Sequence, residues 1–478
     1  MEWRSDGDGK TVRYNGDYTM HRRSVFTALV AATSAMSLAA NPAADIVRAF
    51  MSKNAVPGMA YAVIVKGSIV AHGTYGVSDL KTKEKITDDS VFPIASLSKP
   101  FVAMGVLALV EKGSLKIDDP IGEYLPDLPE AWKPLKIVRL LDHTSGVPDH
   151  INSNAFNWRG REPIGSEELI KKLVSLPLRF KAGERYEYSN GNYVLLAKLI
   201  ERVSGQPYEK FLESRIFEPL GMKHTRALTL ENLPSAVHGH ANGLGGVLPA
   251  TFNPDWCYGN GGLGSSILDL AKLDWGLYTP RILKSSTLSF VTTPQPLSDG
   301  RLVNYAMGWM VGRLRGARAI SHSGRLNGWQ SYFVRYADYN ATVVVLSNHR
   351  DVSLANLAND LAGTVIPNLT MQPITDAYPS LTNDHRGFIE SILTGKVDES
   401  RLDGDLLRDY RSKDRWSGLK EDLRKGARLT VFEPVSRRQT GADAFTSSYR
   451  LELGNRVWKV DLGWNGAGLI NMLTVSGA

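Results

Sequence analysis

The chain has 478 residues, more than the roughly 100–200 of a typical domain, so we expect two or three folded units. Its 43% hydrophobic, 22% charged and 9% aromatic residues indicate a globular protein and exclude disordered, collagen-like and coiled-coil chains. The single cysteine, Cys257, excludes an internal disulfide and a cysteine-based metal centre. The net charge is +7, but the basic residues are not clustered: the densest basic stretch, 401–438, is interleaved with acidic residues. We therefore expect no nucleic-acid partner.

An export signal is predicted near the N-terminus, starting at Met20 rather than at residue 1. Two arginines follow Met20, then comes an apolar, small-residue run from Val25 to Ala40 that contains a small-x-small cleavage pattern at 37–39. We therefore expect a leader at 1–39 and a periplasmic or secreted protein. A surface helix or N-terminal anchor is the alternative, and the run is too short for a stable membrane span.

Residues 43–366 are predicted to form one α/β unit, with strands near both ends and helices between. Strands from distant segments must close one antiparallel sheet, with the helices as an insert and a site between the two parts. The predicted strands are Met59–Val65, Ile69–Tyr75, Met307–Leu314, Trp329–Tyr336 and Ala341–Ser347, and the helices are Phe101–Lys112, Tyr193–Val203, Tyr208–Ile216, Ile267–Leu277 and Val352–Ile366.

A change in composition predicts a second unit after a linker at 367–379. Residues 380–478 are expected to form a small α+β domain, mainly helical over His385–Lys425. Four strands should follow, at Arg428–Phe432, Phe445–Leu453, Val457–Leu462 and Leu469–Val475.

The sharpest chemical signal is Ser96-Leu97-Ser98-Lys99-Pro100, directly before an apolar helix. Residues three apart share a helix face, so the Ser96 hydroxyl and the Lys99 amine can meet. A desolvated, neutral lysine can take the proton of a serine and make it a nucleophile. The same spacing occurs at Ser78/Lys81 and Ser417/Lys420, and an isolated pair of this kind is usually an exposed turn or helix face. Only the Ser96 pair opens an apolar helix.

Two further patterns follow in chain order. Tyr188-x-Asn190 stands at a helix entrance, where a phenol can move a proton and an amide can orient a lysine or a substrate carbonyl. Read alone, it is an N-cap asparagine beside a buried tyrosine. His322-Ser323-Gly324-Arg325 lies between strand runs, where a glycine on an edge strand permits close approach of a substrate and the next backbone N–H can bind an oxyanion.

The ordered set Ser96-x-x-Lys99, Tyr188-x-Asn190 and His322-x-Gly324 resembles the serine hydrolases of the β-lactamase and penicillin-binding fold, in the class C β-lactamase-like branch. Supporting stretches include Leu140–Pro148 and Gly261–Ser266. That branch contains esterases, D-aminopeptidases and D-alanyl-D-alanine carboxypeptidases.

The resemblance implies a role for each of these residues. Ser96 would be acylated, Lys99 and Tyr188 would act as general base and acid, and Asn190 would contact substrate and Lys99. The backbone N–H groups of Ser96 and Arg325 would form an oxyanion hole. The strand residues His322, Ser323 and Gly324 would bind a small-molecule or peptide acyl substrate, with no cofactor or metal.

One departure from the branch concerns substrate choice. His322 stands where class C β-lactamases usually carry lysine, and a histidine is mostly neutral near pH 7. This favours an esterase or D-amino-acid peptidase over an efficient β-lactamase. A penicillin-binding carboxypeptidase, a weak β-lactamase and a non-catalytic acyl-accepting receptor or binding module remain as alternatives.

The sequence also contains four weaker patterns. The G-x-G-x-x-G at Gly259–Gly264 lacks a preceding strand and is interpreted as a turn, and His238-Gly239-His240 as a loop rather than a metal site. The stretch His150–Pro163 is a candidate lid. The order of elements in the C-terminal unit is similar to NTF2-like domains, which implies an accessory role.

Overall fold

The computed structural model describes residues 42–151, 162–244, 246–315, 317–366, 369, 373–404, 406–407, 428–440, 444–454, 456–465 and 468–477. The predicted leader, residues 367–368 and 370–372 of the predicted linker and residues 152–161 of the candidate lid lie outside these ranges.

A seven-stranded antiparallel sheet, in the order β2-β1-β12-β11-β10-β9-β8, forms the centre of the unit predicted over residues 43–366. β1, which comes first along the chain, pairs with β12, which comes last, with Met59 opposite Ser347 and Val65 opposite Ala341. The predicted closure of one sheet by distant segments is therefore confirmed. The strands are β1 (Gly58–Val65), β2 (Ser68–Gly76), β8 (Tyr305–Ala306), β9 (Trp309–Leu314), β10 (Ala317–Leu326), β11 (Trp329–Tyr336) and β12 (Ala341–Ser347).

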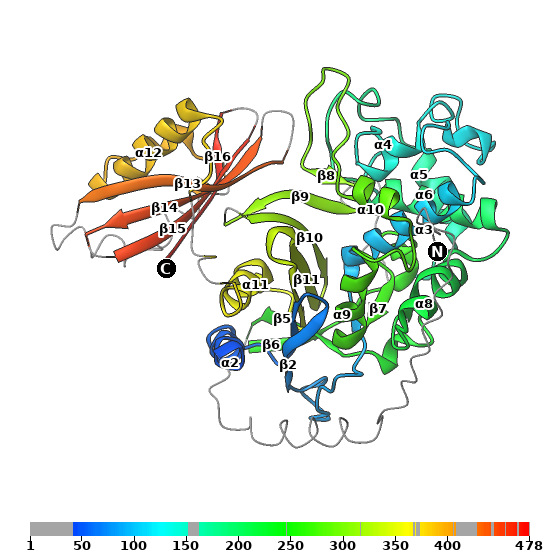
Figure 1. The fold of residues 1–478 in the computed structure, drawn as a ribbon, viewed down its shortest axis with the longest axis horizontal. Coiled ribbons are helices and arrows are strands. Elements are labelled where there is room, and N and C mark those ends of the chain that lie inside the picture. The colour runs from blue at the N-terminus through cyan, green and yellow to red at the C-terminus, as the bar shows by residue number, and fades with distance from the viewer. Residues whose placement is uncertain are drawn as a thin grey trace, which may run out of the picture. The chain divides into compact units, whose positions relative to one another are not determined.

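The two faces of this sheet bury different cores, because successive side chains of a strand point to opposite sides. On β1, Met59, Tyr61 and Val63 pack with helices α2 (Pro42–Asn54) and α11 (Leu354–Gly363). The alternating residues of β1 join the larger core, which contains the buried residues of the inserted helices. In Figure 1, α11 and the inserted helices lie on opposite sides of the sheet.

Helices are the main regular elements of the insert between β2 and β8, as predicted. Its α-helices are α3 (Lys99–Glu111), α4 (Ile137–Leu141), α5 (Ser166–Val174), α6 (Asn190–Ser204), α7 (Tyr208–Leu212), α8 (Glu218–Leu220), α9 (Ile267–Gly276) and α10 (Ser285–Val291). Short strands are β3 (Phe92–Pro93), β4 (Arg226–Ala227), β5 (Gly239–Gly243), β6 (Gly246–Ala250) and β7 (Leu263–Ser265).

Three local expectations need correction. The helix predicted over Tyr208–Ile216 ends as an α-helix at Leu212 and continues as a π-helical turn, Glu213–Phe217. His240 lies in β5 rather than in a loop, because this segment pairs with β6. The residues around His322 are expected on an edge strand, but they form part of β10, which is an inner strand of the sheet.

The C-terminal residues form a separate four-stranded antiparallel sheet, β13 (Leu429–Gln439), β14 (Phe445–Leu453), β15 (Arg456–Trp464) and β16 (Ile470–Gly477). Helix α12 (Pro379–Thr394) packs on it through Phe388, Ile389 and Ile392. The helix ends at Thr394, because Gly395 adopts the left-handed conformation that terminates helices. Residues 404 and 406–407 are helical again, and 408–425 of the stretch predicted as mainly helical lie outside the described residues.

Within the described parts of the chain, we find no helix that is both long and apolar enough to cross a lipid bilayer.

Candidate active site

Ser96 and Lys99 lie at the junction of two helical segments. Ser96 is in a 3₁₀ turn, Ala95–Ser98, and Lys99 is the first residue of α3. The two residues were expected on one α-helix, but the tighter turn brings residues three apart directly over each other. The Lys99 Nζ is 3.0 Å from the Ser96 Oγ. Pro100 is accommodated in the first turn of α3, as expected.

The Lys99 side chain is fully buried and makes two further short contacts. Its Nζ donates to the Asn190 Oδ1 at 2.8 Å and to the Asn260 backbone carbonyl at 2.7 Å. Both of these oxygens can only accept, so they use the two N–H groups of a neutral amine. The remaining lone pair of that amine is then available to the Ser96 hydroxyl.

Burial lowers the pKa of Lys99 from 10.5 to about 7, and the Asp149 carboxylate partly opposes this shift. The rings of Tyr188 and Tyr193 face the amine, with their centroids 4.9 and 5.6 Å from Nζ. A sizeable fraction of Lys99 is therefore uncharged near pH 7, which is the state that can accept a proton.

Tyr188 contacts Ser96 as well. Burial raises the pKa of Tyr188 well above its usual value, and the hydrogen bond between its side chain and Ser96 opposes the rise. The phenol is therefore protonated at neutral pH and can donate to a neighbouring oxygen. Ser96 itself is half-buried, so a substrate can reach it.

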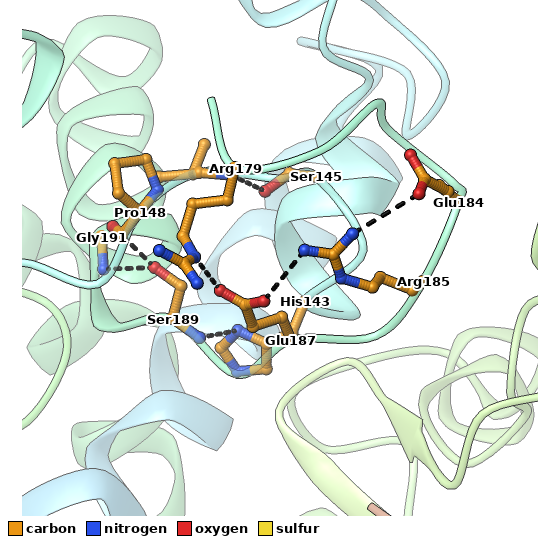
Figure 2. A network of polar contacts seen from close by, with 10 residues as sticks. His143, Ser145, Pro148, Arg179, Glu184, Arg185, Glu187, Ser189 and Gly191 are labelled. Carbon is orange, nitrogen blue, oxygen red and sulfur yellow. Dashed lines mark hydrogen bonds and ion pairs between the residues drawn. The ribbon is translucent and has the colours of Figure 1, made fainter. Parts of the chain in front are cut away.

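A polar network holds the Tyr188–Asn190 segment in place (Figure 2). Ser189 caps α6 by accepting from the Gly191 N–H, and its hydroxyl donates to the Pro148 carbonyl at 2.9 Å. The Ser189 N–H donates to the Nδ1 of the buried His143 at 3.2 Å. The N-cap is thus Ser189, and not Asn190 as the isolated pattern suggested. Asn190 is the first helical residue, which leaves its side chain available to Lys99.

Strand β10 passes close to the 3₁₀ turn that carries Ser96. A Cβ built on Gly324 would lie 2.0 Å from the Ile94 carbonyl, so only glycine fits there. Ala95, directly before Ser96, has a φ of 52°, a strained conformation for alanine. The need for glycine at this position was predicted, but for substrate approach rather than for contact with the chain itself.

The second half of β10 is open on one side. β9 pairs with β10 from Ala317 to Ser321, whereas β11 pairs with it as far as Leu326. β10 is thus an inner strand of the sheet, and not the edge strand expected, but from His322 onward it lacks pairing with β9. An extended substrate could bind along this exposed side.

His322 is buried and engaged with its neighbours. Its Nδ1 is 2.7 Å from the Ser323 carbonyl, which can only accept, so Nδ1 carries a proton. Its Nε2 lies 3.2 Å from the Tyr305 hydroxyl, and its ring centroid is 6.3 Å from that of Tyr188. The side chains of Ser323 and Arg325 are exposed, and Arg325 lies 3.9 Å from Asp351.

Three polar residues of the site carried no recognisable sequence signal. Asn260 contributes a backbone carbonyl from the turn before β7, and Tyr305 contributes a hydroxyl from β8. Asp149 binds the amide of Asn190. An isolated polar residue gives no pattern, so only the folded chain places these groups.

A cysteine nucleophile and a metal centre receive no support from the described residues. Burial raises the pKa of the Cys257 thiol to about 12, so it stays protonated at neutral pH and is a poor nucleophile. Among the described residues, no three His, Cys, Asp or Glu side chains are arranged to hold a metal ion.

Comparison with known proteins agrees with this fold. Residues 43–363 match the beta-lactamase family. Penicillin-binding protein 4* of Bacillus subtilis (strain 168) is 32% identical over 302 residues, covering 60% of this chain and 66% of that protein. A D-aminopeptidase of Brucella anthropi is 29% identical over 297 residues, covering 61% of this chain and 56% of its own. The chain thus spans less than two thirds of either relative's length.

A solved structure supports the fold independently. The D-amino acid amidase from Ochrobactrum anthropi SV3, complexed with D-phenylalanine, superimposes with a TM-score of 0.60 at 24% identity. The match covers 68% of this chain and all of the amidase, 100%. The fold is that of the β-lactamases and penicillin-binding proteins, as predicted. This chain belongs to the beta-lactamase family, a family of serine hydrolases.

Proposed function

We propose that the protein is a serine hydrolase that forms a covalent acyl intermediate on Ser96. The observation that carries this proposal is the buried amine of Lys99, 3.0 Å from the Ser96 Oγ, with its other contacts made to acceptors only. Such an amine is a general base next to a nucleophile.

In the acylation step, Lys99 takes the Ser96 proton while Oγ attacks the substrate carbonyl carbon. The backbone N–H groups of Ser96 and Arg325 stabilise the oxyanion of the tetrahedral intermediate. The leaving group departs with a proton that Lys99 passes on through Tyr188. Water then attacks the acyl-Ser96 ester by the reverse proton path, which releases the acid and restores the Ser96 hydroxyl. Asn190, His322, Ser323 and Gly324 bind the substrate.

We infer that the substrate is an ester or a D-amino-acid amide or peptide. The relative named D-aminopeptidase supports the amide class. The presence of histidine at position 322, held between the Ser323 carbonyl and the Tyr305 hydroxyl, supports it further, because histidine is not a fixed cation for a β-lactam carboxylate as lysine is.

Activity against a substrate panel tests this proposal. The full chain is assayed with p-nitrophenyl acetate, D-alanine p-nitroanilide, a D-alanyl-D-alanine peptide and a chromogenic cephalosporin. We expect turnover of the ester or the anilide to exceed that of the cephalosporin. A dominant carboxypeptidase or cephalosporinase activity would favour the penicillin-binding alternative, and acylation without turnover would favour a receptor.

The remaining parts of the chain have proposed roles as well. We propose that 1–39 is an export leader and that 380–478 is an accessory domain. Mass spectrometry of the exported protein tests the first role, because retention of residues 1–39 would contradict it.

A further inference from the structure

Asp149 lies directly behind the amide that contacts Lys99. Both carboxylate oxygens accept from the Asn190 Nδ2, at 3.1 and 3.2 Å, and Oδ1 also accepts from the Ile151 N–H at 3.0 Å. A carboxylate can only accept, so it selects the NH₂ end of the Asn190 amide. The carbonyl end must then face Lys99, where it accepts at 2.8 Å.

The other groups that face Lys99 are neutral near pH 7. Burial lowers the pKa values of the His143 and His150 rings and raises those of Tyr188 and Tyr193. The Cys257 thiol, with a pKa of about 12, stays protonated. In the described part of the chain, Asp149 is therefore the negative charge that acts on this amine.

We propose that Asp149 is a positioning residue for the reaction: it holds the Asn190 carbonyl toward Lys99 and applies its charge to the amine through that amide. The inference rests on the proposed function, because it assigns Asp149 a part in preparing the general base. Asp149 fixes the orientation of the amide that contacts the base, and its negative charge opposes the effect of burial on the amine. The Ser-x-x-Lys pattern by itself contains neither property.

The two effects have separate signatures in the variant Asp149→Asn. Asparagine keeps one accepting oxygen for the Asn190 amide but has no charge. Because the Asp149 charge favours the protonated amine, its loss makes Lys99 easier to deprotonate. We expect the acidic limb of kcat/KM for p-nitrophenyl acetate to move by about one pH unit toward lower pH. The plateau should fall about tenfold, because the Asn190 amide is held less firmly.

Asp255→Asn is the matched control. Asp255 is also half-buried, and its carboxylate accepts from a backbone N–H, that of Ile164, at 3.2 Å. Its loss should leave the position of the acidic limb unchanged. The uncharged p-nitrophenyl acetate is chosen because it offers no ammonium group that Asp149 could bind directly.

A uniform loss of activity at all pH values, an unmoved limb or a limb moved to higher pH would each overturn the proposal. If Asp149→Asn does not fold, Asp149→Ser removes the same charge and must give the same shift. Titration of Lys99 by NMR in both proteins gives a readout without turnover, and an unchanged pKa would also overturn the inference. Absence of Ser96-dependent turnover in the unaltered protein would instead contradict the proposed function.

Discussion

The Ser-x-x-Lys pattern occurs at Ser96–Lys99 and at Ser78–Lys81, and the fold gives the two pairs different surroundings. Lys81 is exposed in the turn after β2, where its backbone N–H is bound by the Asp79 carboxylate at 2.6 Å. Lys99 is fully buried, with three oxygen partners. The spacing is identical, so burial and the acceptors around the amine, rather than the motif, create the candidate base.

Replacing the two lysines gives the largest contrast. We expect Lys99→Ala to lower kcat for p-nitrophenyl acetate by about 10³-fold or more, because Ser96 loses its proton acceptor. Lys81→Ala should leave kcat within about twofold, since an exposed side chain away from the site contributes little. Equal losses in the two variants would show that the pattern at Ser96 has no special chemical role.

Tyr188→Phe should have the next largest effect. The substitution keeps the ring against Lys99 but removes the hydroxyl that meets Ser96, so proton transfer to the leaving group is impaired. We expect kcat to fall by about 10²-fold, the usual contribution of a general acid or base, in steady-state assays. Substrates with better leaving groups should be affected less, and an equal loss for poor and good leaving groups would argue against this role.

The pH dependence of the unaltered protein should produce a smaller change in activity than either active-site substitution. Lys99 must be uncharged to accept a proton, and its pKa is about 7. Activity should therefore rise through pH 7 and level off about one unit above it, measured as kcat/KM between pH 5 and 9. A value of kcat/KM that still rises about tenfold per pH unit at pH 9 would mean that Lys99 behaves like an exposed lysine, and the contrast with Lys81 would disappear.

Sequence patterns were sufficient for the main elements of the fold because strand and helix periodicities are strong in the catalytic unit. They did not predict that β10 lies inside the sheet, since strand periodicity does not give the order in which strands pair. They did not locate the end of α12 within the stretch predicted as mainly helical, because this helix is ended by the left-handed conformation of Gly395 rather than by a change in composition.

For the site, spacing placed Ser96 beside Lys99 and Asn190 at a helix entrance. The contributions of Asn260 and Asp149 could not be predicted, because each comes from a loop whose path depends on tertiary packing. The distance along the chain makes this clear: the Lys99 amine reaches the Asn260 carbonyl across 161 residues.

The most direct test of the central claim is the mass of the protein during turnover. The full chain is mixed with p-nitrophenyl acetate, quenched in acid and analysed intact and after digestion. We predict a gain of one acetyl group, located on the peptide that contains Ser96 and missing in Ser96→Ala, whereas Ser78→Ala still acquires it. An adduct on another residue, or a Ser96→Ala variant that turns over at the parent rate, would contradict the account.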